Sequence, residues 1–193
     1  MPRVKLFDKE KTLHKAMELF WKKGYYDTSI QNMVSYLGIN RGSMYTTFES
    51  KKVLFNKSLS LYCAINEEAT RKFLQDETDV REGLKKIFVA FIQDAINDTE
   101  GRGCFAVNTT TEIGSNDEEV FKLLLQHKQN TEDIFYQYLL KGQKSGQIPS
   151  NKDLKSISFL IYTLFNGIRV VSNLEKDDKN LMTSLDSILS LLS

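Results

Sequence analysis

Apolar residues recur along this chain at intervals of three and four, which is the spacing of one face of an α-helix. In the first such segment, Lys9 to Gly24, the apolar positions are Leu13, Ala16, Met17, Leu19 and Phe20. Glycine directly after such a stripe is a common helix end. FAVNTTT is the one β-branched run, and it is short, so strand signals are weak. The pattern predicts an all-α protein with about nine helices.

Two of the predicted helices are short and polar. Thr28 opens the first of them, and Gln31, three residues later, completes a capping-box pattern. Gly38 ends this helix, and Asn40 can cap the next one. Two short helices joined by such a turn, with the first helix of the chain behind them, predict a helix-turn-helix arrangement.

The second short helix, at about residues 41–47, has polar residues where packing residues are expected. Gly42 allows close approach of the backbone to DNA, and Arg41 can reach a guanine edge or a phosphate. An exposed helix of this size fits the major groove. Lys51 and the backbone amides near Thr28 suit phosphate oxygens. We therefore expect DNA contacts from Thr28, Arg41, Gly42, Ser43, Tyr45, Thr46, Thr47 and Lys51.

Charge is unevenly divided along the chain. The formal net charge is only +1, yet residues 1–57 contain 11 Lys or Arg against 5 Asp or Glu. Residues 58–193 contain 15 Lys or Arg against 20 Asp or Glu. This asymmetry favours a basic end that binds a polyanion, the alternative being chance clustering of solvated lysines. Basicity confined to one small region argues against a non-specific DNA-compacting protein.

Composition predicts a soluble protein of the cytoplasm. Hydrophobic residues make up 41% of the 193 residues. The amino terminus lacks a signal-peptide pattern, and no run approaches the roughly 18 apolar residues of a membrane helix. Cys63 and Cys104 do not make a disulfide framework. We expect no membrane partner.

A longer motif surrounds the two short helices. It reads Thr28-x-Ile30-x-x-Met33-Val34, then Leu37-Gly38-Ile39-Asn40-Arg41-Gly42-Ser43-Met44-Tyr45-x-x-Phe48-x-Ser50-Lys51-x-x-Leu54-Phe55. Over about residues 9–57 the chain resembles the TetR/AcrR family of bacterial transcriptional regulators. Thr46-Thr47 is a departure, because an aromatic residue and a histidine are common there, and the operator sequence is therefore left open.

The resemblance implies an all-helical homodimer that binds double-stranded operator DNA. Residues 1–57 would form the helix-turn-helix domain, and residues 58–193 a helical domain for effector binding and dimerisation. Members of this family usually repress transcription until a small molecule releases them from the operator. The implied function is a ligand-responsive repressor.

Two apolar stripes near the end of the chain are candidates for subunit contact. They lie on helices expected at about residues 152–173 and 179–192, where Gly167 would allow close approach of another helix. Two such helices can form a four-helix contact across a two-fold axis, or they can pack only within their own subunit. The candidate interface residues are Ile157, Ile161, Leu164, Phe165, Ile168, Leu185 and Leu189.

An effector pocket is expected among the helices of about residues 80–144. Its candidate residues suggest an apolar or aromatic effector with few polar groups, although aromatic residues there also suit a plain core. The candidates are Phe88, Phe91, Phe105, Asn108, Glu112, His127 and Cys104.

Cys104 is the basis of an alternative function. It falls at an expected helix start beside Arg102, and both features lower the pKa of a thiol and favour the reactive thiolate. The chain would then be a repressor that senses oxidants or electrophiles, whereas the other interpretation is a packed helix start. Cys63 is expected to be structural.

Catalytic and metal-binding patterns are weak. His14 and His127 are the only histidines, so a Cys104–His127 pair is the best available nucleophilic arrangement, and nothing orients it. No His/Cys cluster has the spacing of metal ligands. We expect no enzyme activity, no metal and no cofactor.

Overall fold

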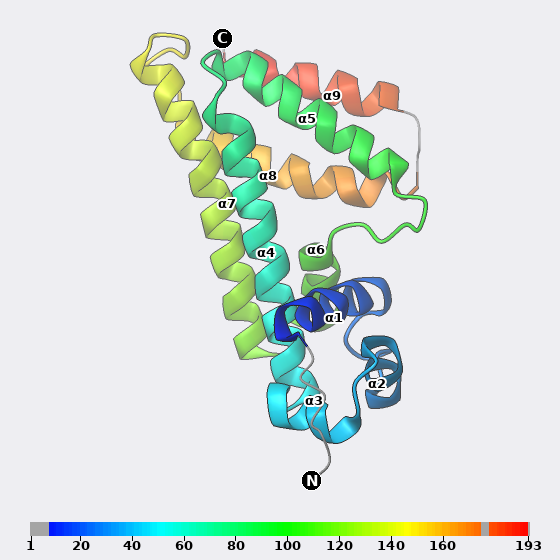
Figure 1. Cartoon of the computed structure of the whole chain (residues 1–193). Coiled ribbons are helices and arrows are strands. Elements are labelled where there is room, and N and C mark those ends of the chain that lie inside the picture. The colour runs from blue at the N-terminus through cyan, green and yellow to red at the C-terminus, as the bar shows by residue number, and fades with distance from the viewer. Residues whose placement is uncertain (1–7, 175–177, 193) are drawn as a thin grey trace. The chain divides into compact units, whose positions relative to one another are not determined.

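The computed structural model describes residues 8–174 and 178–192, and every regular element among them is a helix (Figure 1). The α-helices are α1 (Lys9–Lys23), α2 (Ile30–Leu37), α3 (Arg41–Phe48), α4 (Lys51–Gln75), α5 (Val80–Asn97), α6 (Phe105–Thr109), α7 (Glu118–Lys144), α8 (Leu154–Val171) and α9 (Asp178–Ser190). A short π-helix, η1 (Thr110–Gly114), follows α6 directly. The predicted all-α fold with about nine helices is confirmed over the described residues.

Local signals define the ends of α1. The Asp8 carboxylate accepts hydrogen bonds from the backbone N–H groups of Glu10 and Lys11, which satisfies two of the unpaired donors at the helix start. The helix ends at Gly24, whose φ of 78° is in the region that favours glycine. The predicted start and end of this helix are confirmed.

The helices form two compact units. The first contains the described residues up to Ala64 together with Phe105–Leu124. The second contains Ile65–Cys104 and the described residues from Leu125 onwards. Helices α4 and α7 contribute residues to both units. The first unit thus reaches beyond residue 57 and includes α6 and η1, because the buried Phe105 ring packs edge-on against Phe55 and Tyr62, with both centroid distances 5.6 Å.

The core of the first unit holds α1, α2 and α3 against the start of α4. Phe20 of α1 packs edge-on against Phe55 of α4, with ring centroids 5.1 Å apart. Met33 of α2 and Met44 and Phe48 of α3 are buried. Leu37 of α2 is buried as well, so each short helix contributes only two large core side chains, and its other residues are at least partly exposed.

The second unit has its own hydrophobic core, in which α5 packs against α8 and α9. An aromatic cluster lies within it. Phe165 of α8 stacks on Phe91 with ring centroids 3.6 Å apart, and it contacts Phe88 and Phe135 edge-on at 5.3 and 5.6 Å. Offset and edge-on pairs of this kind stabilise a core beyond the area that they bury.

Candidate DNA-binding site

The start of α2 lies one capping residue later than the sequence predicted. Ser29, not Thr28, is the N-cap: its hydroxyl accepts from the Asn32 N–H at 3.0 Å, and the Ser29 N–H donates to the Asn32 side chain at 3.0 Å. Thr28 is fully buried, and its hydroxyl donates to the Gly24 carbonyl at 2.7 Å. The Thr28 side chain is therefore engaged within the protein, and a DNA contact through the backbone near Thr28 stays a prediction.

The turn between α2 and α3 follows the expected pattern. Gly38 has a φ of 67°, and a Cβ there would meet no atom of the described residues within 4 Å. Backbone conformation alone therefore explains the glycine. The Asn40 side chain accepts from the Ser43 N–H at 2.7 Å, so the predicted cap of α3 is confirmed.

Helix α3 presents a small polar surface. Arg41, Gly42, Tyr45 and Thr46 are exposed, while Ser43 and Thr47 are half-buried. The Thr46 hydroxyl donates to the Gly42 carbonyl at 2.9 Å. The Arg41 guanidinium lies 5.8 Å from the centre of the Tyr45 ring, whose residue is 38% exposed. Six of the predicted DNA contacts therefore share one short helix.

Gly42 also protects the cap of its own helix. A Cβ at this position would lie 3.3 Å from the Asn40 side-chain oxygen, which is tighter than most real contacts of this kind. A larger residue would push against the group that satisfies the Ser43 N–H. The glycine thus allows close backbone approach and keeps the cap intact.

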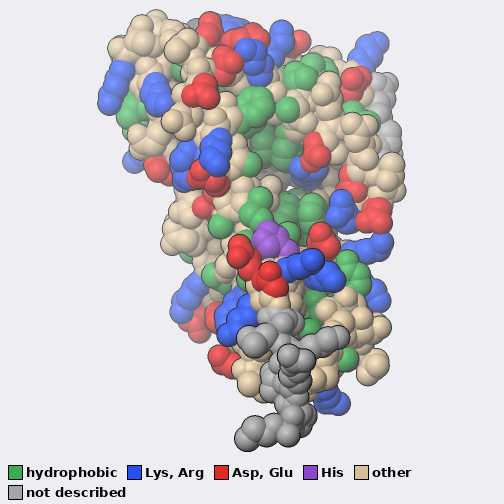
Figure 2. Space-filling view, in the orientation of Figure 1, with side chains coloured by type: hydrophobic (Ala, Val, Ile, Leu, Met, Phe, Trp, Pro, Cys, Tyr) green, Lys and Arg blue, Asp and Glu red, His purple; other side chains and the backbone are tan. Residues whose placement is uncertain are grey.

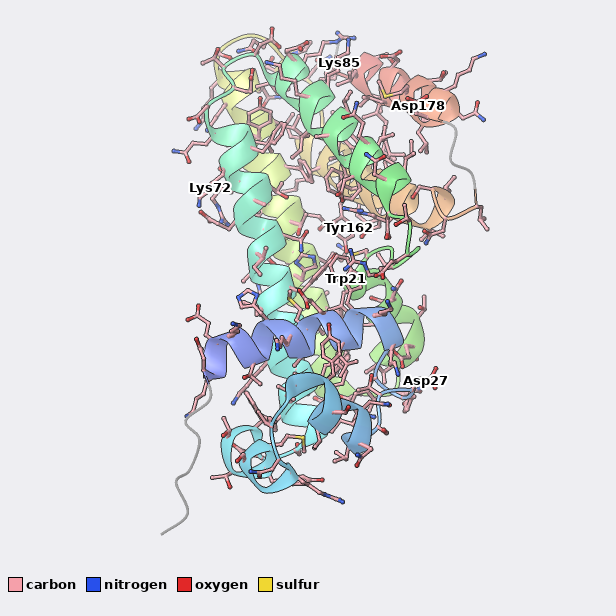
Figure 3. The ribbon with its side chains drawn as sticks, turned by 45° about the vertical axis from the view of Figure 1, so that its right-hand side comes forward. Trp21, Asp27, Lys72, Lys85, Tyr162 and Asp178 are labelled. Carbon is pink, nitrogen blue, oxygen red and sulfur yellow. The ribbon has the colours of Figure 1, made fainter. Side chains whose placement is uncertain are left out.

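Lys51, the first residue of α4, lies over an aromatic ring. Its ammonium is 4.3 Å from the centre of the Tyr25 ring, a cation–π distance. Burial lowers the pKa of Lys51, while Glu112 and Asp27 act in the opposite direction. Figure 3 labels Asp27 in the turn between α1 and α2. The lysine is therefore held beside this turn at the start of α4.

Glu112 has a role that the sequence did not indicate. Its carboxylate oxygens accept hydrogen bonds from the backbone N–H groups of Tyr25 at 3.0 Å and Tyr26 at 2.8 Å. At Gly24, whose φ is positive, a Cβ would lie 2.8 Å from this carboxylate. Glu112 thus ties η1 to the turn between α1 and α2. This corrects its assignment as an effector-binding residue, because each of its oxygens already accepts a backbone hydrogen bond within the first unit.

A second tie joins α4 to the start of α7. The Lys52 ammonium donates to the Asp117 carboxylate, which also accepts from the Val120 N–H at 3.0 Å. The hydrogen bond from Lys52 and then the bond from Val120 lower the pKa of Asp117. Asp117 therefore serves both as a helix cap and as an ion-pair partner.

The excess of basic residues before residue 58 does not appear as one continuous patch on the face shown in Figure 2, where Lys and Arg side chains alternate with Asp and Glu. Part of the reason is local pairing, as at Lys52 and Asp117. No acidic residue lies in the first turn of α2 or α3. The first turns of these two helices thus contain no carboxylate, which suits an anionic ligand.

The predicted effector-binding residues are divided between the two units. The first unit contains Phe105, Asn108 and Glu112, and the second contains Phe88, Phe91, Cys104 and His127. Phe88 is fully buried in the aromatic cluster. His127 of α7 pairs with Glu67 of α4, and its Nδ1 lies 2.6 Å from Glu67 Oε1. Several of these residues therefore have structural partners already.

The two cysteines differ in burial, and neither forms a disulfide in the described part of the chain. Cys63 is buried in α4, whereas Cys104 is half-buried and directly precedes α6. Arg102 Nε lies 3.5 Å from Glu100 Oε2 and 3.9 Å from Asp98 Oδ1. Carboxylates therefore partly balance the charge that was expected to act on Cys104.

The predicted interface residues lie mostly in the core of their own subunit. Five of the seven are buried in the second unit: Ile157, Ile161, Ile168, Leu185 and Leu189. Leu164 and Phe165 are partly buried against the same core. This corrects the assignment of the five buried residues, because their side chains have no surface left for a partner.

The other face of α8 is exposed and apolar. Phe159 is 54% exposed and Leu160 40%, and Val170 and Val171 are also exposed. Within the part of the chain that the structure describes, a Cβ at Gly167 would meet nothing within 4 Å. By length and composition alone α8 is apolar enough to cross a membrane, with 28% of its residues buried. This combination of a buried and an exposed apolar face leaves one side of α8 uncovered.

Together, the helical fold and the exposed polar surface of α3 define a helix-turn-helix regulator. A family profile described as "Bacterial regulatory proteins, tetR family" matches residues 13–57. Another, described as "Tetracyclin repressor-like, C-terminal domain", matches residues 81–188, more than half of the chain. The chain belongs to the TetR family of DNA-binding transcriptional regulators.

Relatives of known sequence include other regulators. The chain is 28% identical over 194 residues to the uncharacterized HTH-type transcriptional regulator YezE of Bacillus subtilis (strain 168), with 100% of both chains covered. It is 28% identical over 171 residues to the HTH-type transcriptional repressor ComR of Escherichia coli (strain K12), covering 87% of this chain and 80% of ComR.

Two solved structures share the fold. A cysteine mutant of the TetR family regulator CifR, complexed with 26-bp operator DNA, has a TM-score of 0.86 at 22% identity and covers 99% of this chain and 100% of its own. The reduced form of E. coli NemR has a TM-score of 0.86 at 16% identity, covering 95% and 96%.

Proposed function

We propose that this TetR-family protein is a ligand-responsive repressor, which a small apolar or aromatic effector releases from its operator. The observation that carries the DNA-binding part is the polar surface of α3, which contributes only Met44 and Phe48 to the core. Because so few side chains of α3 pack in the core, we attribute the polar residues on its exposed side to contact with DNA. Placement in the cytoplasm follows from a role at chromosomal DNA, and no catalytic activity is proposed.

Arg41, Gly42, Ser43, Tyr45, Thr46, Thr47 and Lys51 remain our candidates for DNA contact. Arg41 stands at the first position of α3, where a guanidinium can bond a guanine edge or a phosphate. Lys51 begins the following helix and suits a phosphate. The α3 residues would read base edges, while Lys51 would fix the position of the helix on the duplex.

Arg41→Ala tests this assignment directly. Loss of a specific arginine contact should cost about 1–3 kcal/mol, which corresponds to roughly 5- to 150-fold in affinity for a duplex selected by the wild-type protein. Arg71→Ala is a matched control, because Arg71 pairs with Glu68 on the surface of the second unit. Fluorescence anisotropy should show a loss for Arg41→Ala alone, and equal binding by both variants refutes the contact.

We also propose a homodimer that uses the exposed face of α8. Two-fold symmetry presents two α3 helices to one side of the duplex, about 34 Å apart, as half-site reading requires. Leu160→Glu places a charge on this face without touching the core. Sedimentation should then show a monomer at concentrations where the wild type is dimeric. Ser184→Glu, a solvent-exposed change on α9, should leave the dimer intact.

Effector binding is proposed for the second unit, beside Phe88 and Phe91. The ring of Phe91 is only half-buried, and Arg169 lies 4.2 Å from its centre while bonding Asp94 at 2.5 Å. An aromatic effector would form ring contacts of the same kind with Phe91, each worth about 0.5–1.5 kcal/mol beyond the area that it buries. Phe91→Ala should weaken the response to an inducer and leave operator affinity without inducer unchanged.

A thiol-based response through Cys104 is the alternative, favoured by its half-exposed position before α6. Blocking the thiols with a maleimide and measuring operator affinity separates the two possibilities. Under the alternative, the wild type and Cys63→Ser lose affinity on treatment, whereas Cys104→Ser does not. Unchanged affinity of the treated wild type contradicts thiol sensing and leaves the effector proposal standing.

A further inference from the structure

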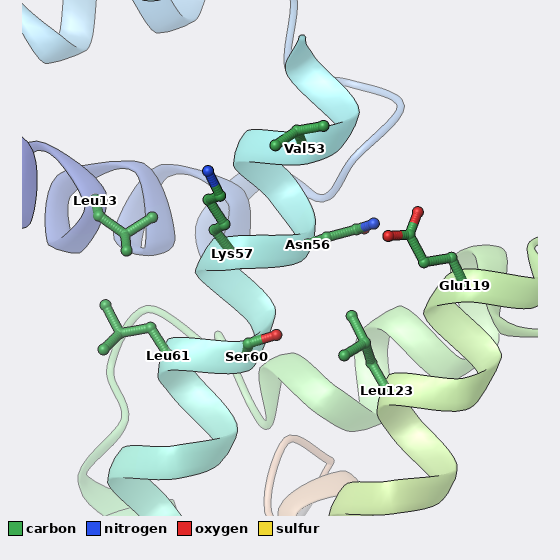
Figure 4. A pocket seen from close by; sticks show the side chains of 8 residues that line it. All are labelled: Leu13, Val53, Asn56, Lys57, Ser60, Leu61, Glu119 and Leu123. Atoms are coloured by element: carbon green, nitrogen blue, oxygen red, sulfur yellow. The ribbon is translucent and has the colours of Figure 1, made fainter. Parts of the chain in front are cut away.

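The first unit contains a groove among α1, α4 and the start of α7, shown in Figure 4. Its volume is about 530 Å³, within the range of small-molecule sites. Apolar walls come from three helices: Leu13 of α1, Val53 and Leu61 of α4, and Leu123 of α7. The proposed effector residues Phe88 and Phe91 belong to the other unit, so this groove is a separate feature.

Asn56 distinguishes this groove from an ordinary surface depression. The residue is only 7% exposed, yet its side-chain nitrogen and oxygen are both buried without a hydrogen-bond partner among the described residues. Buried polar groups in folded proteins nearly always have such a partner. On the same helix the buried Ser58 hydroxyl donates to the Leu54 carbonyl at 2.8 Å. Within the described residues the Asn56 amide therefore makes no hydrogen bond of the kind that the Ser58 hydroxyl makes.

The amide faces the groove. Figure 4 shows the Asn56 side chain pointing from α4 towards Glu119 of α7, across the space between the two helices. Glu119 and Lys57 are exposed at the rim, and their charges are opposite. Rotation of the exposed Glu119 side chain would open the amide to a ligand. The opposite charges of Lys57 and Glu119 thus leave the rim without net charge, and the buried polar group, the Asn56 amide, is uncharged.

We propose that this groove binds a small neutral molecule with an apolar body and an amide-type edge, such as a carboxamide, a lactam or a related heterocycle. The Asn56 side chain offers one N–H donor beside one carbonyl acceptor, and a second amide edge satisfies both at once. A carboxylate would leave the Asn56 oxygen unpaired and would face Glu119. An ammonium would leave the Asn56 nitrogen unpaired. This ligand site is additional to the effector site proposed above and does not depend on it.

Benzamide is a suitable probe, and N,N-dimethylbenzamide is its matched control, since it keeps the ring and the carbonyl but has no N–H donor. Titration of the ¹⁵N-labelled full chain, followed by NMR, should give saturable shifts of the Asn56 side-chain N–H signals with benzamide. Dimethylbenzamide should bind at least tenfold more weakly. Equal binding of the two probes, or shifts that do not saturate, overturns the proposal.

Three variants separate binding from structure. Asn56→Leu should reduce benzamide affinity at least tenfold without lowering the unfolding midpoint, because it removes a buried amide that has no hydrogen-bond partner in residues 8–174 and 178–192. Ser60→Phe, which fills the groove from an exposed position, should block binding with Asn56 still present. Asn130→Leu is the control: this amide donates to Glu67 at 2.9 Å in the second unit, and benzamide binding should persist. Undiminished binding by Asn56→Leu or by Ser60→Phe, or a large drop in the unfolding midpoint of Asn56→Leu, contradicts the site.

Discussion

Glu112 provides a sharp test of how the DNA-binding helices are held. Its carboxylate accepts two backbone hydrogen bonds, from Tyr25 at 3.0 Å and from Tyr26 at 2.8 Å, across 87 and 86 residues of sequence. Glu112→Ala removes both acceptors and leaves the two N–H groups of the turn without them. We expect this substitution to destabilise the first unit and to loosen the turn between α1 and α2.

The size of the effect follows from the exposure of the two N–H groups. A hydrogen bond to a charged group contributes about 1.5–3 kcal/mol. The bond to Tyr25 is partly buried and should contribute within this range, whereas the bond to Tyr26 is exposed and water can replace it. Glu112→Ala should therefore lower the free energy of unfolding by about 2 kcal/mol, and Glu112→Gln by about 1 kcal/mol, since the amide oxygen remains an acceptor.

Urea unfolding at one fixed protein concentration measures these differences, because the stability of an oligomer depends on concentration. Glu68→Ala is the control: Glu68 forms surface ion pairs with Arg71 and Lys72, and its loss should cost less than about 1 kcal/mol. A Glu112→Ala protein as stable as the control, within about 0.5 kcal/mol, refutes the tie.

A double-mutant cycle with Gly24 adds a second criterion. Gly24→Ala forces a residue with a Cβ into a φ of 78° and places that Cβ 2.8 Å from the Glu112 carboxylate. In the Glu112→Ala background only the backbone strain remains. The two substitutions should therefore cost less together than the sum of their separate costs, by about 1 kcal/mol. Strict additivity contradicts the close contact.

Further predictions concern DNA binding and pH. Lys51→Ala should weaken binding to all duplexes alike and reduce the slope of log affinity against log salt by about 1. Tyr45→Phe should weaken binding mainly to the selected duplex, by about 1 kcal/mol. If both variants bind DNA as tightly as the wild type, the assigned contact face is wrong. The pKa of Asp117 is lowered from 3.8 in the folded state, so its stabilising contribution is present above pH 3.8 and is lost as pH falls through the lower, folded value. Asparagine caps a helix as well as aspartate does, so Asp117→Asn removes the ion pair with Lys52 and keeps the cap. In urea unfolding, this variant should be less stable than the wild type at neutral pH and equally stable below the folded pKa of Asp117. A stability difference that does not change with pH contradicts the role of the ion pair. Burial, with Glu77 and Asp79, raises the pKa of Tyr138 from 10.0 to about 12. Tyr138 should therefore contribute a fall in wild-type stability of about 1.4 kcal/mol per pH unit between these values, and Tyr138→Phe should lack this part of the decline.

Helix positions follow from local signals, which is why most of the fold could be predicted. The ends of α1 at Asp8 and Gly24, the turn at Gly38 and the cap at Asn40 each depend on residues within four positions of one another. The start of α2 is the exception, because Thr28 and Ser29 can both cap a helix. Burial of Thr28 against the end of α1 decides between them, and that contact is tertiary.

The assignments that failed depend on partners far away in sequence. An apolar stripe predicts a buried face but not what covers it. In α8 the stripe of Ile157, Ile161 and Ile168 packs in its own unit, and the uncovered side contains Phe159 and Leu160. Glu112 likewise looked available for an effector, because nothing in the local sequence indicates a bond to a turn 87 residues away.

DNA selection by the purified 193-residue chain tests the central claim most directly, namely that two α3 helices read a duplex together. The account predicts enrichment of a near-palindromic site with half-site centres about 34 Å apart, bound at least 1,000-fold more tightly than random duplex at physiological salt. Recovery of no common sequence, or equal affinity for the selected and random duplexes, would contradict it.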